Sequence, residues 1–351
     1  MKVHRSQSSA LAGAGTRSGA GTRSGAGAGA GAGAVLLLAA LLLPAAAFAH
    51  PSGLPQLRDR AGLALNEAGT WLIWDFHPSI LIGIGLAIAL YALATTRWRE
   101  KLGGPGTPAS SPGRHLLFLA TMTLQYFTLD GPLHHLADDL LFSAHMAQHL
   151  ILQLVWAPLL VISLPVWLWR ALVQPVLPLA RWATRPMVAF LLFNAVVYGW
   201  HLPAMYNLAL TTHNFHILQH VLFMSTAVLS WFVVLAPLPE LRASFPKRAA
   251  YILLSMVAMK VLGILISLSD HVLYTFYLGQ PRAWGMDALS DQELGGLLMW
   301  LPGGIVLWVG LGRLFWMWVR SGTPANGMTG VASIDAARAH LRHPRESGGP
   351  G

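Results

Sequence analysis

Cysteine is absent from all 351 residues of this chain. Its absence excludes disulfides, thiolate metal sites and thiol nucleophiles together. Any metal ion that the protein binds must therefore be held by His, Met, Asp or Glu side chains.

Charged residues are also scarce, at 11% of the chain, whereas hydrophobic residues make up 54%. With 14 tryptophans and a mean hydropathy of +0.53, the sequence is too apolar for a soluble domain of this length. Its apolar runs lack the alternation of apolar and polar residues that membrane barrel strands require. These observations predict an all-α fold, a polytopic bundle of helices in a lipid bilayer. The net charge of +9 does not indicate a nucleic-acid partner, because the basic residues lie in short clusters beside the apolar runs.

The first 49 residues have the features of a leader. Residues 1–34 are of low complexity, with GTRSGA present twice and an Ala/Gly alternation after it. An apolar stretch then ends in Ala47-Phe48-Ala49, which is typical of a cleavable signal peptide after a basic region. An uncleaved signal anchor is the alternative. We expect residues 50–76 to form a periplasmic segment and residues 321–351 a disordered cytoplasmic tail.

Seven later runs approach the roughly 20 residues that a helix needs to cross a bilayer. They predict a seven-helix transmembrane domain over residues 77–320, with spans at 77–96, 115–133, 140–165, 186–203, 213–236, 249–269 and 294–319. Loops rich in Arg and Lys alternate with loops rich in His. Because basic loops stay in the cytoplasm, the histidine-bearing ends are expected on the outer side.

Eleven of the 15 histidines fall near that outer end of the predicted spans. They are His50, His77, His134, His135, His145, His149, His201, His213, His216, His220 and His271. This one-sided placement concentrates side chains that can bind metal ions at one water interface.

Two pairs of histidines have helical spacing. His145 and His149 share one face of the third span, and His216 and His220 repeat the spacing at the start of the fifth. His201 ends the fourth span on the same side. Neutral imidazole suits Cu, Zn, Fe and Ni, so these five histidines predict a metal site.

Other residues could complete or support such a site. Met146 could add a thioether, which would favour Cu(I), and His77 is a further candidate ligand. Asp270 could accept a hydrogen bond from a ligand imidazole. Lys260 lies near the middle of the sixth span, where a lone charge costs roughly 2.5–3.5 kcal/mol, so it should face protein or water.

Three aspartates border the second and third spans. We expect Asp130, Asp138 and Asp139 to be solvated or capping groups, with Asp138 or Asp139 at the N-terminus of the third helix. The adjacent His134 and His135 are expected in a loop.

Several sequence blocks resemble one family, the CtaG-type (caa3-type) cytochrome c oxidase assembly factors of bacterial cytoplasmic membranes. The blocks occur in the family's order between about residues 70 and 320. They are Phe76-His77-Pro78, Leu136-Ala137-Asp138, His145-Met146-Ala147-Gln148-His149, Trp200-His201-Leu202-Pro203 with Tyr206, then His216, Gln219 and His220, and Asp291-Gln292-Glu293-Leu294-Gly295-Gly296-Leu297-Leu298-Met299-Trp300-Leu301-Pro302-Gly303. Gly131-Pro132-Leu133-His134-His135 differs from the family's Ser-Pro-Leu-Asp turn.

The resemblance implies a multi-pass protein that helps a haem-copper oxidase to mature and that catalyses no reaction of its own. Oxidase subunits are the implied partners. Our hypothesis adds copper as the bound ion and copper chaperones as candidate partners, with Lys260 and Asp291 as structural or conformational residues.

Two other functions remain open at this point. A haem- or quinone-binding membrane oxidoreductase could use His149 and His220 as iron ligands. A metal transporter could use Lys260 and the outer histidines to line a pathway.

Overall fold

A computed structural model describes Trp74 and residues 76–321 of the chain. This part is helical throughout and contains no strand, which confirms the predicted all-α class. The predictions for residues 1–49, 50–73 and 322–351 lie outside the described residues.

Nine helices form the body of the bundle in the described part of the chain. They are α3 (Pro78–Thr95), α5 (Pro112–Asp130), α7 (Phe142–Leu150), α8 (Ala157–Ser163), α11 (Pro186–His201), α13 (His213–Leu235), α14 (Phe245–Ser267), α15 (Ala288–Trp300) and α16 (Pro302–Ser321). Shorter helices connect them. These are α4 (Arg99–Gly103), α6 (Pro132–His135), α9 (Val166–Val173), α10 (Leu177–Ala183) and α12 (Pro203–Thr211), with the π-helical turns η3 (Leu136–Leu140) and η4 (Ile151–Trp156) and the 3₁₀ turns η5 (Gln174–Val176), η6 (Pro239–Leu241), η7 (Thr275–Gly279) and η8 (Ala283–Gly285).

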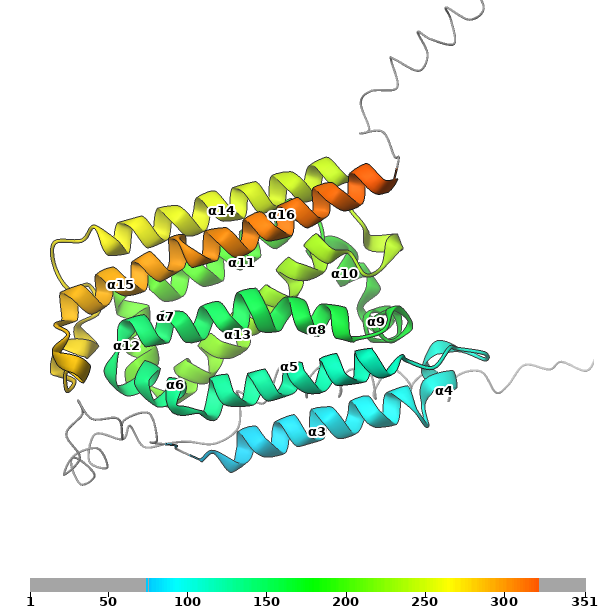
Figure 1. The fold of residues 1–351 in the computed structure, drawn as a ribbon, viewed down its shortest axis with the longest axis horizontal. Helices are drawn as coiled ribbons and strands as arrows, with labels where there is room; N and C mark the ends of the chain where they lie inside the picture. The colour runs from blue at the N-terminus through cyan, green and yellow to red at the C-terminus, as the bar shows by residue number, and fades with distance from the viewer. Residues whose placement is uncertain (1–73, 75, 322–351) are drawn as a thin grey trace, which may run out of the picture.

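The long helices run along the long axis of the molecule (Figure 1). In turn, α3 packs against α5, α5 against α8, α8 against α13, α13 against α11, and α11 against α14. Helix α15 packs against both α14 and α7, and α16 lies beside α14. A large buried cluster of apolar side chains fills the space between them, with Trp156, Phe223 and Met224 among its most buried members.

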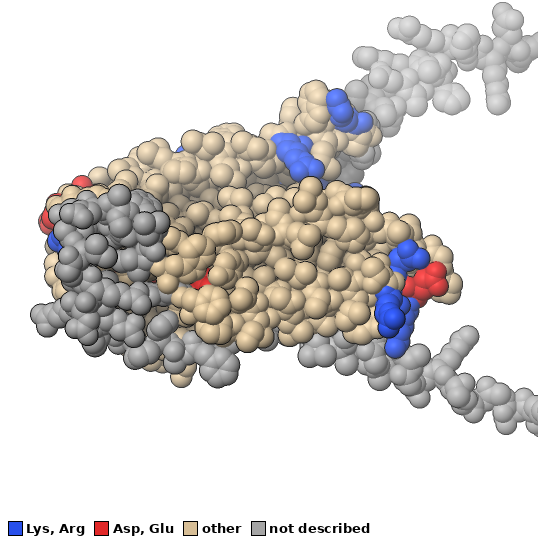
Figure 2. All heavy atoms as spheres, turned by 60° about the horizontal axis from the view of Figure 1, so that its bottom comes forward, with Lys and Arg blue, Asp and Glu red and all other residues tan. Residues whose placement is uncertain are grey.

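The two ends of the bundle differ in composition. One end, on the left in Figure 1, carries α6 and α12 and is called the histidine end below. The other carries α4, α9 and α10. Figure 2 shows most of the visible Lys and Arg side chains at this second end, called the basic end.

The predicted count of seven spans is not confirmed. By length and hydropathy, five segments of the described chain could cross a membrane, or six if the pair Val166–Ala183 and Pro186–His201, bent by 88°, forms one span. Helix α5 is the least apolar of the predicted spans, since it carries Arg114, Gln125 and Asp130. Helix α11 has only 16 residues, which is short for a hydrocarbon core of about 30 Å.

The third predicted span begins at Phe142, because Leu141 is in an extended conformation. Its N-terminal N–H groups are satisfied by a residue distant in sequence. The carboxylate of Asp291, on α15, accepts hydrogen bonds from the backbone N–H groups of Phe142 and Ser143 at 2.7 and 3.0 Å, and from the Ser143 hydroxyl at 2.5 Å. The prediction that Asp138 or Asp139 caps this helix is therefore wrong.

Glycines allow α15 to approach its neighbour closely. A Cβ atom on Gly296 would lie 2.7 Å from the carbonyl oxygen of Gly263 on α14. That separation is too short for any side chain, so the two backbones can touch only because both residues are glycine.

Replacing Asp291 with Ala is expected to lower the free energy of unfolding by about 1–3 kcal/mol, because it leaves the buried N–H groups at the start of α7 without an acceptor. Thermal unfolding of the purified protein in detergent would measure the loss. Glu293→Ala is the matched control, since Glu293 lies two residues along α15 and is exposed. Equal unfolding temperatures for the two variants would contradict the capping role.

Candidate functional site

Four histidines from two helices meet inside the histidine end. His145 and His149 extend from α7, and His216 and His220 from α13. The ring centroids of His145 and His216 lie 5.9 Å apart, and those of His149 and His220 lie 5.1 Å apart. Within each helix the spacing of four residues places both rings on one face, with centroids 4.3 Å apart on α7 and 4.7 Å apart on α13. Two helices thus present facing pairs of imidazoles.

A carboxylate from the π-helical turn η3 joins this group. The Asp138 Oδ2 atom lies 3.3 Å from His216 Nδ1 and 3.4 Å from His134 Nε2, and its Oδ1 atom lies 3.7 Å from His145 Nδ1. Burial raises the pKa of Asp138 well above its usual value, and the charge of the neighbouring Asp139 raises it further. A cation bound in the pocket would attract the negative carboxylate and so favour ionisation of this group.

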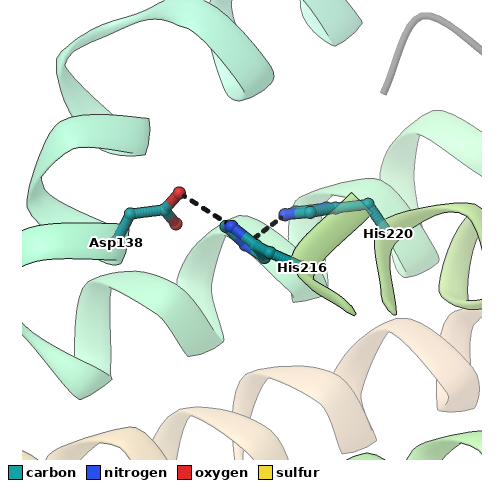
Figure 3. Close-up of side chains that lie close together, drawn as sticks. All are labelled: Asp138, His216 and His220. Atoms are coloured by element: carbon teal, nitrogen blue, oxygen red, sulfur yellow. Dashed lines mark hydrogen bonds and ion pairs between the residues drawn. The ribbon is translucent and has the colours of Figure 1, made fainter. Parts of the chain in front are cut away.

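Asp138, His216 and His220 form a row (Figure 3). Beyond the contact of Asp138 with His216 Nδ1, the Nε2 atoms of His216 and His220 face each other at 3.0 Å. One ligand atom from each of the three residues can be chosen so that all lie within 4.8 Å of one another. Two nitrogens that each bind one ion at about 2.0–2.1 Å can lie no more than about 4.2 Å apart. The separation of the two Nε2 atoms meets this condition.

Buried polar atoms in the pocket lack hydrogen-bond partners among the described residues. They include both ring nitrogens of His149, the Nδ1 atom of His220 and the Oδ1 atom of Asp138. His149 is only 4% exposed. Leaving a buried donor or acceptor unpaired costs about 1–3 kcal/mol, so we expect a bound ion or water molecule to satisfy these atoms. The donor set, imidazole nitrogen with one carboxylate, suits Cu, Zn, Fe or Ni.

Further polar residues surround the four histidines. Gln148 donates a hydrogen bond to the carbonyl oxygen of Thr128 at 2.8 Å and contacts His134 Nδ1 at 2.9 Å. His77, predicted as a possible ligand, binds Asp130 through both its backbone N–H and its ring nitrogen Nδ1. The His77 ring lies 5.5 Å from that of His134, at the edge of the pocket.

His201 and Met146 lie beside this group and contact each other. The Nδ1 atom of His201 donates to the carbonyl oxygen of Val197 at 2.6 Å, and its Nε2 atom lies 3.4 Å from the Met146 sulfur. The ring of His201 packs near Tyr206 and Phe223, with no close ring contact to the four histidines. These two predicted ligands therefore form a pair of their own.

The three predicted supporting residues lie outside the pocket. The carboxylate of Asp270 contacts its neighbour His271 at 2.7 Å, and both side chains are exposed. Lys260 is half-buried in α14 and forms no ion pair with any described residue. Asp291 binds the start of α7, as described above.

The sequence assigned solvated or capping roles to three aspartates; this was wrong for Asp138 and Asp130, whereas the Asp139 side chain is 26% exposed. Asp138 contacts three imidazoles, Asp130 is 1% exposed and binds His77, and Asp139 lies 3.2 Å from His135 Nδ1. The available signal was the spacing of four residues that links His134 to Asp138 and His135 to Asp139. Because residues four apart lie on one face of a helix, this spacing predicts that each of the two histidines contacts its aspartate.

Comparison with known proteins identifies the family to which the chain belongs. Residues 89–321 match the model of the family described as cytochrome c oxidase caa3 assembly factor (Caa3_CtaG). The chain is also 28% identical over 250 residues to the uncharacterized proteins Mb0105 of Mycobacterium bovis and MT0111 of Mycobacterium tuberculosis. The alignment covers 65% of this chain but only 36% of each relative, so the chain spans about a third of their length. No solved structure matches.

The family match covers about two thirds of the chain and includes Asp138 and all four histidines of the pocket. This protein belongs to the cytochrome c oxidase caa3 assembly factor family.

Proposed function

We propose that this protein binds copper transiently at the pocket formed by Asp138, His145, His149, His216 and His220, and passes it to a haem-copper cytochrome c oxidase during assembly. The observation that carries the proposal is the convergence of imidazoles from α7 and α13, with buried ring atoms that have no hydrogen-bond partner among the described residues. Family membership supplies the oxidase as the partner. In this proposal the protein delivers an ion and catalyses no reaction.

The chemistry of the donors supports transient binding. Imidazole ligands hold copper without thiolate, and the chain has no cysteine that could hold the ion more tightly. A protein that hands over its cargo needs an affinity that a receiving site can exceed. Copper chaperones would then be the source of the ion, and an oxidase subunit would be its destination.

The distribution of charge supports an outward-facing pocket. Lys and Arg side chains gather at the basic end, opposite α6 and α12 (Figures 1 and 2). Since basic loops stay in the cytoplasm, we place the histidine end on the outer side of the cytoplasmic membrane. This orientation requires an odd number of crossings between α3 and α16, and we propose that all seven segments predicted from the sequence cross.

Removing one imidazole from each helix should remove the copper. His149→Ala and His220→Ala are each expected to reduce the copper content of protein purified with copper present by about 10-fold or more. His271→Ala is the matched control, because His271 lies at the same end but is exposed and outside the pocket. Metal analysis of the four purified proteins measures the effect.

Copper contents equal to that of the parent in both pocket variants would refute this ligand assignment. Gel filtration of each variant separates loss of copper from loss of fold. A visible spectrum of the parent with a Soret band would instead favour haem bound by these histidines.

Single cysteines can report the orientation, because the chain contains none of its own. Asp270→Cys places a thiol at an exposed position of the histidine end, and Ala109→Cys places one in the exposed loop between α4 and α5 at the basic end. A membrane-impermeant maleimide is expected to label Asp270→Cys in intact cells and Ala109→Cys only after permeabilisation. The opposite pattern would contradict the proposed orientation.

A further inference from the structure

We infer that the pocket is built for a divalent ion, Cu²⁺ in the case of copper, held by imidazole nitrogens that the Asp138 carboxylate orients, and that it does not use the Met146 sulfur that would suit Cu⁺. This inference rests on the proposed function and specifies the oxidation state of the ion.

Asp138 acts first by fixing how the imidazoles present their nitrogens. Its Oδ2 atom lies 3.3 Å from the Nδ1 atom of His216, so the carboxylate favours the tautomer with the proton on Nδ1, which leaves a lone pair on the Nε2 atom. That Nε2 atom is the one that faces His220. A carboxylate behind a ligand histidine is the usual arrangement at metal sites, where it fixes the ring and makes the nitrogen more basic.

The same carboxylate reaches histidines from three elements. It lies 3.4 Å from His134 of α6 and 3.7 Å from His145 of α7, as well as contacting His216 of α13. Asp138 therefore lies where its charge can act on rings from separate helices at once. We assign it as a positioning residue for the metal site.

The charge of the pocket favours a dication. The ion-pair partners of Asp138 within the described part of the chain are histidines, with no Lys or Arg among them. At a given distance, the attraction between a carboxylate and a divalent ion is twice that for a monovalent ion. This attraction favours Cu²⁺ over Cu⁺, and the donor atoms act in the same direction.

The sulfur that would favour Cu⁺ is used elsewhere. Met146 follows His145 in sequence, but successive residues on a helix point about 100° apart. Its sulfur lies 3.4 Å from His201 Nε2, and His201 in turn binds the carbonyl oxygen of Val197. The donors that remain around Asp138 are nitrogen and oxygen, and cuprous ions prefer softer ligands than these.

The test compares Asp138→Asn with two matched variants. Asp139→Asn removes the neighbouring carboxylate, which contacts His135 instead of the pocket, and Met146→Leu removes the sulfur while keeping its volume. Each full-length protein, purified without metal in detergent, is titrated with Cu²⁺ in air and with Cu⁺ without oxygen, each against a competing chelator. Electron paramagnetic resonance of the Cu²⁺ form reports the nitrogen ligands.

We expect Asp138→Asn to weaken Cu²⁺ binding by at least about 10-fold and to change its resonance spectrum. Met146→Leu should bind Cu²⁺ as the parent does, and Asp139→Asn should lose much less affinity than Asp138→Asn, because the Asp139 carboxylate contacts His135 and acts on Asp138 only through its charge. Asp138→Glu, which keeps the charge, should restore part of the affinity and thereby exclude a general loss of fold.

Two results would overturn the inference while leaving the proposed function intact. One is a parent-like Cu²⁺ affinity in Asp138→Asn. The other is a parent that binds Cu⁺ more tightly than Cu²⁺ and loses that preference in Met146→Leu. Failure of the parent to bind copper in either oxidation state would refute the proposed function itself.

Discussion

The arrangement of the histidine end depends on the carboxylate of Asp138, which needs polar partners inside an apolar bundle. Asp138 contacts imidazoles from α6, α7 and α13, so the positions of these three elements are coupled through one side chain. A second carboxylate, Asp291, binds the first N–H groups of α7 from α15. Helix α7 is therefore held at its start by Asp291, and one turn later its His145 side chain lies 3.7 Å from the Oδ1 atom of Asp138.

Around the pocket, a layer of hydrogen bonds holds residues that do not face its centre. Gln148 links His134 to the carbonyl oxygen of Thr128, and Asp130 holds His77 beside His134. Rings that are held in place before an ion arrives lose little conformational freedom when it binds. Such a pocket can reach a useful affinity without thiolate ligands, which is compatible with later release.

Helical periodicity made the four central histidines predictable, because pairs spaced by four residues on apolar helices share one face and lay at one membrane level. Asp138 was not predictable as a pocket residue from the same argument. The chain from Leu136 to Leu140 forms a π-helical turn, and Leu141 breaks the helix before α7 begins. A continuous helix from residue 140 would have placed Asp138 at an N-terminus instead. The assignment of Met146 as a ligand stays a prediction; helix geometry turns its sulfur toward His201.

The number of membrane crossings was harder to predict than the grouping of the four histidines. Helix α5 is long enough to cross but is the least apolar of the predicted spans, whereas α11 is short. Polar residues such as Gln125 and Asp130 make α5 less apolar than a span that faces lipid, yet both are buried against protein. Hydropathy measures transfer of each residue to lipid, whereas these side chains transfer into a protein interior that offers hydrogen bonds, such as the one from Trp156 to Gln125. The polar residues that make α5 a weak candidate for a membrane span also explain why it lies beside the pocket, because one of them, Asp130, binds His77. His77 lies outside the residues that match the family, whereas Asp130 and the pocket around Asp138 lie inside them. The copper hypothesis therefore concerns the part of the chain that defines the assembly factor family, and His77 extends that site from the N-terminal side.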